Sequence, residues 1–344
     1  ADAIFAISQS AAQEVIEYTD IASDRVLNIS SAVGEEFAVI DYSAERIQSL
    51  KDKYSLPDEF ILTLAMIEPR KNIEALIHAY SMLPAELQQR YPMVLAYKVH
   101  PEDLERILRL AESYGLSRSQ LIFTGFLTDD DLIALYNLCK LFVFPSLHEG
   151  FGLPPLEAMR CGAATLGSNI TSLPEVIGWE DAMFNPHDVQ DIRRVMEKAL
   201  TDEAFYRELK AHALTQSAKF SWANTAHLAI DGFSRLLQSS KGAHAGQAEG
   251  VTASRIQTMQ KIDALSEVDR LGLAWAVARN GFKQHTRKLL VDISVLAKHD
   301  AKTGIQRVSR SILSELLKSG VPGYKVSAVY YTPGECYRYA NQYL

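Results

Sequence analysis

The sequence has few cysteines and no long apolar run. Its three cysteines, Cys139, Cys161 and Cys336, lie far apart and lack metal-ligand spacing, so a reducing, cytoplasmic compartment is favoured over a disulfide framework or a zinc cluster. The nine histidines form no His-Glu-x-x-His arrangement. No stretch approaches the roughly 18 apolar residues of a membrane-spanning helix, and no signal peptide is recognisable. The net charge of −7 argues against a nucleic-acid-binding protein.

The composition is that of an ordinary globular protein, and apolar runs recur along the chain. The 344 residues are 47% apolar and 22% charged, which is enough chain for two domains. The predicted strands are 3–8, 25–29, 60–66, 93–97, 121–124, 141–144, 164–167, 287–294 and 324–331. Because predicted helices separate most of them, the fold class is α/β with a parallel, doubly wound sheet. Such sheets bind ligands at the carboxyl ends of their strands.

One stretch, 142–162, organises the rest of the chain. A short buried strand, 141–144, leads into a loop with two glycines, and two consecutive prolines then suit the first turn of a helix. Gly162 is a natural stop for that helix. A strand, a glycine loop and a helix N-terminus can together present backbone N–H groups to an anion. Glu149 and Glu157 bracket this loop, with seven residues between them.

The Glu-x7-Glu spacing, with Gly-Phe-Gly-Leu-Pro-Pro-Leu inside it, closely resembles the signature of retaining GT-B glycosyltransferases of the group 1, family 4 type. That group includes bacterial polysaccharide mannosyltransferases, among them tandem-domain O-antigen enzymes. The segment 162–176, which contains Ser-Leu-Pro-Glu-Val, is also similar to the group. The resemblance implies transfer of a hexose, with retention at the anomeric carbon, from a nucleotide sugar to a growing polysaccharide.

The same resemblance implies the partners of the chain. They are a nucleotide-sugar donor substrate, best predicted as GDP-mannose, and a glycan acceptor of lipopolysaccharide synthesis, free or lipid-linked. No cofactor, metal or nucleic acid is expected, because Asp129 to Asp131 is predicted to start a helix rather than bind a metal. The location is cytoplasmic, with peripheral association at the inner face of the membrane as an alternative. A sugar-nucleotide epimerase and a non-catalytic nucleotide- or glycan-binding lobe stay open as other functions.

Two cations follow a predicted strand and precede a helix that Asn72 is expected to cap. Arg70 and Lys71, fixed at that point, would stabilise the negative charge that develops on a leaving diphosphate. The alternative interpretation is that Arg70 and Lys71 are a solvated pair of charged residues on a loop. Many members of the resembling family carry an earlier arginine, at the position of Ala65 or Met66 here. Lys71 is therefore the favoured phosphate ligand, and Arg70 is expected to compensate for the missing arginine.

The two glutamates are expected to bind different groups of the donor. By resemblance, Glu149 faces the transferred hexose near the reacting centre; the alternative is a salt-bridged surface residue. Glu157 is placed in the first turn of its helix, where the dipole stabilises a carboxylate, and the resemblance implies that it accepts hydrogen bonds from the ribose hydroxyls. His148 is expected to be solvated or structural.

Further residues are expected to line the donor site. The glycine loop would present backbone N–H groups to hexose and phosphate, because glycine permits close approach. Gly125 and Phe126 resemble the segment that lines the base pocket, with ordinary core as the alternative for Phe126. Ser172 either contacts phosphate or caps the following helix. The residues of the glycine loop are Gly150, Phe151, Gly152 and Leu153.

The chain is predicted to consist of successive parts. Residues 1–37 resemble the end of an N-terminal acceptor lobe, and residues 38–237 resemble the nucleotide-sugar-binding lobe. A flexible linker and a connecting helix follow at 238–286, the helix covering about 253–280. Residues 287–344 resemble the beginning of a second glycosyltransferase module, so a fragment of a tandem enzyme is expected.

Overall fold

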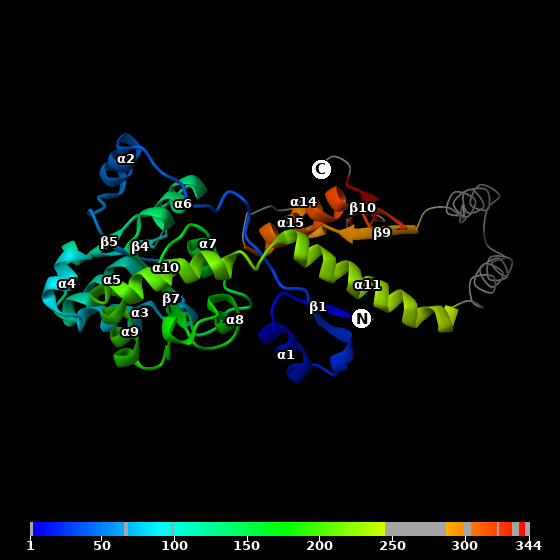
Figure 1. The fold of residues 1–344 in the computed structure, drawn as a ribbon, viewed down its shortest axis with the longest axis horizontal. Coiled ribbons are helices and arrows are strands. Elements are labelled where there is room, and N and C mark those ends of the chain that lie inside the picture. Colours follow the sequence, from blue (N-terminus) through cyan, green and yellow to red (C-terminus); the bar gives the residue numbers. More distant parts are fainter. Residues whose placement is uncertain are drawn as a thin grey trace. The chain divides into compact units, whose positions relative to one another are not determined.

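The computed structural model describes residues 3–64, 68–97, 100–244, 287–298, 304–321, 323–331 and 337–340. The chain divides into two compact units, one of Ile4–Thr225 and one of Ala1–Ala3 with Ala226–Leu344 (Figure 1). The boundary between them lies within helix α11 (Trp222–His244). The predicted division into domains stays a prediction.

The larger unit is built on six parallel strands in the order β5-β4-β3-β6-β7-β8. Their bounds are β3 Ile61–Leu64, β4 Met93–Ala96, β5 Leu121–Phe123, β6 Leu141–Phe144, β7 Thr165–Ser168 and β8 Met183–Phe184. Strands β4, β6 and β7 are buried along their whole length, as is typical of a parallel sheet covered on both faces. This burial explains the continuous apolar runs in the sequence. The predicted α/β fold with a parallel sheet is confirmed, although the very short β8 was not predicted.

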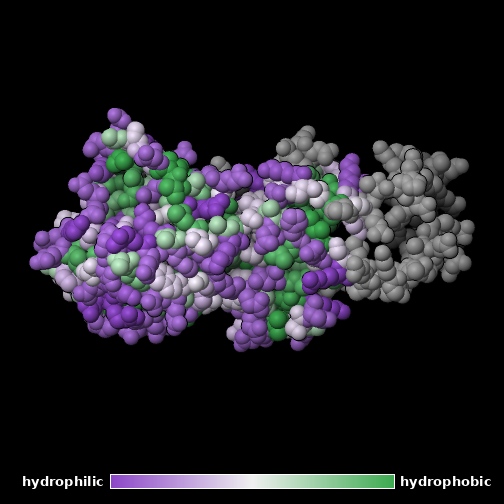
Figure 2. All heavy atoms as spheres, in the orientation of Figure 1, coloured by the Kyte–Doolittle hydropathy of each residue, from purple (hydrophilic) through white to green (hydrophobic). Residues whose placement is uncertain are grey.

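The helices of this unit pack against one another around the sheet (Figure 1), and α9 also contacts α10. Helix α3 packs against α5 and α9, whereas α7 packs against α6, α8 and α10. The face of this unit drawn in Figure 2 is mostly hydrophilic, as expected when the apolar sides of the helices are turned to the sheet. The helix bounds are α2 Ala44–Tyr54, α3 Ile73–Ser81, α4 Ala85–Arg90, α5 Pro101–Ser113, α6 Asp129–Leu138, α7 Leu153–Arg160, α8 Leu173–Ile177, α9 Val189–Thr201 and α10 Glu203–Ser217.

The strand order reverses between β3 and β6. From β3 the chain adds β4 and β5 on one side, and it then returns to add β6, β7 and β8 on the other. Strands β3 and β6 are direct neighbours, paired through Ile61 with Leu141 and Leu62 with Phe142. In open α/β sheets, ligands bind in the crevice outside the carboxyl ends of the strands at such a reversal. The loops that follow β3 and β6 therefore form the expected binding edge.

The first residues of the larger unit form a separate pair of parallel strands. Strands β1 (Ile4–Ala6) and β2 (Val26–Asn28) pair directly, with helix α1 (Gln9–Tyr18) between them in the sequence. Ser8 caps α1, because its hydroxyl accepts the N–H of Ala11 at 2.9 Å. The strand–helix–strand prediction for this part is confirmed.

The starts of helices α3 and α6 differ in their capping. Asn72 has a φ of +56°, and its side chain does not cap α3. Its amide instead donates to the carbonyl of Pro186 at 2.8 Å, so the predicted cap is wrong. Thr128 does cap α6, accepting the N–H of Asp131 at 3.2 Å, but the Asp131 side chain has other partners.

Asp131 joins α6 to α2. Its carboxylate accepts hydrogen bonds from Arg46 at 2.5 Å, Lys53 at 2.7 Å and Tyr54 at 2.6 Å. Burial raises the pKa of this carboxyl, but the three hydrogen bonds outweigh burial and hold the pKa well below its ordinary value. The carboxylate is thus engaged by protein donors, which favours the predicted helix start over a metal site.

After the end of α11, the described part of the second unit contains a strand, two helices, a parallel strand and a short final strand. Its elements are β9 Arg287–Asp292, α14 Ser294–Lys298, α15 Gly304–Ser319, β10 Tyr324–Tyr330 and β11 Arg338–Tyr339. Strand β10 pairs in parallel with β9 and antiparallel with β11. The two strands predicted here, at 287–294 and 324–331, are confirmed, whereas α14 and β11 were not predicted. The helix predicted over 253–280 lies outside the described residues.

Candidate functional site

The loops after β3 and β6 are bound to each other where the strand order reverses. After β3 the chain makes a 3₁₀ turn, Pro69–Lys71, and after β6 it forms the glycine loop that leads into α7. The carbonyl of Arg70 accepts the N–H of Leu147 at 2.7 Å and the hydroxyl of Ser146 at 3.0 Å. These bonds bring the predicted cations next to Glu149, 78 positions later in the sequence than Lys71.

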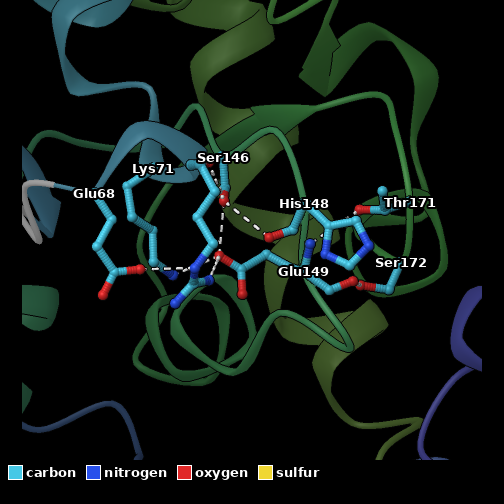
Figure 3. Close-up of polar contacts among 8 residues, drawn as sticks. Glu68, Lys71, Ser146, His148, Glu149, Thr171 and Ser172 are labelled. Carbon is cyan, nitrogen blue, oxygen red and sulfur yellow. Dashed lines mark hydrogen bonds and ion pairs between the residues drawn. The ribbon is translucent and has the colours of Figure 1, made fainter.

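A partly buried ion pair joins Lys71 to Glu149 (Figure 3). The Lys71 Nζ lies 2.5 Å from Oε1 of Glu149, and only 7% of Lys71 is exposed. The same ammonium lies 5.1 Å from the centre of the Phe144 ring. The hydroxyl of Ser146 donates to the same carboxylate oxygen at 2.7 Å. The solvated-pair interpretation is therefore wrong for Lys71. Glu149 is salt-bridged, as its alternative interpretation expected, but its side chain is only 12% exposed.

Arg70 lies closer to solvent than Lys71. Its side chain is 45% exposed, with Nη1 3.5 Å from Oε1 of Glu149 and Nε 2.7 Å from Oε2 of Glu68. The four side chains Glu68, Arg70, Lys71 and Glu149 carry no net formal charge. A diphosphate can therefore bind these cations only by competing with the carboxylates that already hold them.

The shape of the glycine loop depends on Gly152. This residue has a φ of +106°, and a Cβ there would lie 2.7 Å from Cδ2 of Leu173, so a larger residue would require rearrangement. Phe151 is buried in an apolar cluster beneath the loop, so its backbone alone is left to face a ligand. A Cβ on Gly150 would meet only Ile7, at 3.7 Å.

Glu157 is buried under the loop and is the fifth residue of α7, not part of its first turn. The prediction that placed it in the first turn is wrong, because α7 begins at Leu153, directly after Gly152. Tyr136 donates its hydroxyl to Oε2 of Glu157 at 3.0 Å. Burial, together with the charge of Glu157, raises the pKa of Tyr136 well above its ordinary value, so the phenol stays a donor. The ribose contact predicted for Glu157 stays a prediction.

Ser172 is completely buried, and its hydroxyl donates to the backbone carbonyl of Glu149 at 2.8 Å. It occupies the N-cap position of α8 without a side-chain cap bond. The cap interpretation is therefore wrong. Contact between Ser172 and a phosphate stays a prediction.

Gly125 and Phe126 follow β5, on the opposite side of β3 from Glu149 in the strand order. Phe126 is 73% exposed, so the core interpretation is wrong and the ring is available to a ligand. Gly125, with a φ of +70°, forms an isolated bridge with Tyr97. Sequence reasoning missed Tyr97, a half-exposed aromatic residue directly after β4; its position at a strand end was the available signal.

Helix α1 contacts the loop that carries Glu149. Nε2 of His148 lies 2.8 Å from Oε1 of Glu14, which supports a structural interpretation of His148. The carboxylate of Glu175, in α8, accepts the N–H groups of Gln9 and Ser10 at 2.7 and 2.8 Å. These contacts link segments more than a hundred positions apart, and no local sequence pattern predicted them.

Solved structures place this α/β architecture in a known class. A glycosyltransferase from Rickettsia africae ESF-5 superposes with a TM-score of 0.60 at 18% identity, covering 69% of this chain and 64% of its own. Sucrose-phosphate synthase from Thermosynechococcus elongatus superposes with a TM-score of 0.58 at 22% identity, covering 70% of this chain and 59% of its own. At such identities the likeness shows the fold alone, which is that of the GT-B glycosyltransferases.

Sequence comparison gives the family. The model of the family described as Glycosyl transferases group 1 matches residues 47–218, and the chain belongs to this family. The chain is 96% identical over 344 residues to the serotype-specific mannosyltransferase WbdA of Escherichia coli, and it spans 42% of the length of that protein. It is 34% identical over 235 residues to the O-antigen chain mannosyltransferase B of Escherichia coli, covering 68% of this chain and 60% of that protein. The resemblance stated from the sequence is confirmed.

Proposed function

We propose that the chain carries the donor-binding lobe of a retaining mannosyltransferase, which transfers mannose from GDP-mannose to a growing O-antigen polysaccharide. The names of two relatives, at 96% and 34% identity, support the sugar, because both are mannosyltransferases. The second name, which contains O-antigen chain, supports the acceptor. Because the chain spans 42% of the first relative, the complete reaction is proposed for the longer protein.

The partly buried Lys71–Glu149 pair at the strand reversal is the observation that carries this proposal. When the donor reacts, the bond between the anomeric carbon and the phosphate oxygen breaks, and its electron pair leaves with the diphosphate. Lys71, assisted by Arg70, stabilises the negative charge that grows on this oxygen. A site shielded from water strengthens that interaction, and the stabilisation is greatest in the transition state.

The order of groups along the sheet edge supports the same assignment. Phe126 follows β5, the cations of the 3₁₀ turn follow β3, and Glu149 follows β6, in the strand order β5-β4-β3-β6. A nucleotide sugar presents a base, a diphosphate and a hexose in the same sequence. In the proposal, Phe126 contacts the base, Lys71 and Arg70 bind the diphosphate, and Glu149 faces the hexose. The ribose contact of Glu157, which lies on α7 after β6, is proposed from the motif and not from this order.

The acceptor in this proposal is a glycan, free or lipid-linked, and transfer takes place in the cytoplasm or at the inner face of its membrane. In the part of the chain that the structure describes, no helix is both long and apolar enough to cross a membrane.

Cys139 and Cys161 are buried, unpaired thiols, and burial raises the pKa of Cys161 to about 12. Such unreactive thiols fit a reducing compartment. The proposal includes no metal and no cofactor, and the nucleotide sugar takes part as a substrate.

Calorimetry with GDP-mannose, GDP, UDP-glucose and UDP tests the donor assignment on the chain itself. We expect the guanosine ligands to bind more tightly than the uridine ligands and to raise the melting temperature accordingly. Anomeric NMR of the product formed by the longer protein tests retention. Preference for a uridine ligand would refute GDP-mannose as the donor. Release of an altered nucleotide sugar without acceptor would instead identify an epimerase.

A further inference from the structure

The main chain of Glu149 is held by two consecutive side chains of the loop after β7. Oγ1 of Thr171 accepts the N–H of Glu149 at 3.3 Å, and Oγ of Ser172 donates to the carbonyl of Glu149 at 2.8 Å. Figure 3 shows both residues on the main-chain side of Glu149, whereas Lys71 lies at its carboxylate. Both polar backbone groups of Glu149 are thus fixed from one neighbouring loop.

Thr171 makes this contact from an unfavourable backbone conformation. Its φ is +55°, in the left-handed region that β-branched residues rarely adopt. A glycine would adopt it without strain, but a glycine has no hydroxyl to accept the N–H of Glu149. Strained residues of this kind persist only where the surrounding structure holds them, and they concentrate at functional sites.

We propose that Thr171 is a positioning residue for Glu149: its hydroxyl, together with that of Ser172, fixes the main chain from which the carboxylate reaches the hexose. Ser146 fixes the other end of the side chain, through its 2.7 Å hydrogen bond to Oε1. A carboxylate restrained at both ends loses little freedom when the donor binds. This inference rests on the proposed function, because it takes Glu149 to face the hexose.

Thr171→Val and Thr171→Ser, with Glu149→Ala as the reference, test the inference by calorimetry on the whole chain. Valine keeps the β-branch and the backbone strain but cannot accept the N–H, whereas serine keeps the hydroxyl. The measured quantity is the GDP dissociation constant divided by that of GDP-mannose, which reports the contribution of the hexose. We expect Thr171→Val to lower this ratio about five- to tenfold, as for the loss of one hydrogen bond, while GDP affinity and melting temperature stay near those of Thr171→Ser. Thr171→Ser should retain the ratio of the unchanged protein.

The outcomes separate this inference from the function on which it rests. If Glu149→Ala lowers the ratio but Thr171→Val does not, the positioning role is overturned and the hexose role of Glu149 stands. If Thr171→Val weakens GDP and GDP-mannose equally, Thr171 only maintains the loop, which also overturns the inference. If Glu149→Ala leaves the ratio unchanged, Glu149 does not face the hexose and both proposals fail.

Discussion

Replacing Lys71 with methionine isolates the charge that the proposed mechanism needs. Methionine keeps a long, unbranched side chain that can stay packed against Phe144, but it cannot bind a phosphate oxygen as a cation. A hydrogen bond to a charged group contributes about 1.5–3 kcal/mol, which corresponds to roughly a ten- to hundredfold loss of GDP affinity. Calorimetry with GDP measures that loss directly, and circular dichroism checks the fold.

Replacing Glu149 should act on GDP in the opposite direction. This carboxylate and a diphosphate would compete for Lys71, because the Lys71 Nζ already lies 2.5 Å from Oε1 of Glu149. Glu149→Gln removes the competing charge while keeping an oxygen that can accept from Ser146. GDP affinity should therefore stay equal or rise, by up to about tenfold. The additional affinity for GDP-mannose over GDP should fall, since the hexose loses its acceptor.

The chain offers a matched control for these variants. Lys198 lies 3.3 Å from a carboxylate oxygen of Asp181 and 4.0 Å from the centre of the Phe205 ring. Like Lys71, it has a carboxylate and an aromatic ring as neighbours, but it lies in α9 and its side chain is 39% exposed. Lys198→Met should leave GDP affinity unchanged. Unchanged GDP binding in a folded Lys71→Met variant would refute the phosphate role of Lys71. Equal losses in the Lys71 and Glu149 variants would show that Glu149 also binds the diphosphate.

Further variants test other parts of the site and the fold. Glu157→Gln should weaken GDP about tenfold or more but weaken 2′-deoxy-GDP less, because that ligand keeps only the 3′-hydroxyl, and calorimetry showing equal losses would contradict the ribose contact. Hydrogen bonds hold the pKa of Asp131 below its ordinary 3.8, so their stabilisation is present at neutral pH and is lost as the pH falls below that value. Asp131→Asn should therefore lower the free energy of unfolding by about 2 kcal/mol at pH 7 and flatten its decline in acid, and denaturation with an unchanged acid slope would contradict this. Gly152→Ala should lower the melting temperature more than Gly115→Ala, because both have positive φ but only Gly152 would bring a Cβ against Leu173; equal shifts would show that backbone strain alone matters.

The parts of the fold that the sequence predicted are those encoded by local pattern. Strands β4 and β6 are continuous apolar runs, and β3 is apolar except for Thr63, because both faces of the sheet are covered. Gly162 follows α7 with a φ of +77°, as a helix stop requires. The Glu-x7-Glu spacing also predicted the loop between β6 and α7, because the strand, the loop and the helix are adjacent in the chain.

Local pattern could not predict contacts between distant loops. The pairing of Lys71 with Glu149 depends on β3 and β6 being neighbours, and strand order is a property of the whole sheet. The expected cap at Asn72 failed because its amide finds the carbonyl of Pro186, 114 positions away. Thr171 was missed for the same reason: its backbone conformation and its bond to Glu149 appear only when β6 and β7 lie side by side.

The two carboxylates and two cations at the strand reversal carry no net charge together, and this affects both donor binding and product release in the proposed reaction. On the proposed function, a donor entering this site would take the place of Glu149 at Lys71, while Ser146 keeps its hydrogen bond to the carboxylate and leaves it facing the hexose. After transfer the hexose is gone, while the diphosphate still holds the lysine. Glu149 can then return to Lys71, and re-forming that 2.5 Å contact offsets part of the free energy needed to release the diphosphate. On the proposed function, a carboxylate fixed beside the lysine would thus limit inhibition by the diphosphate product, whereas a lysine without such a partner would retain that product.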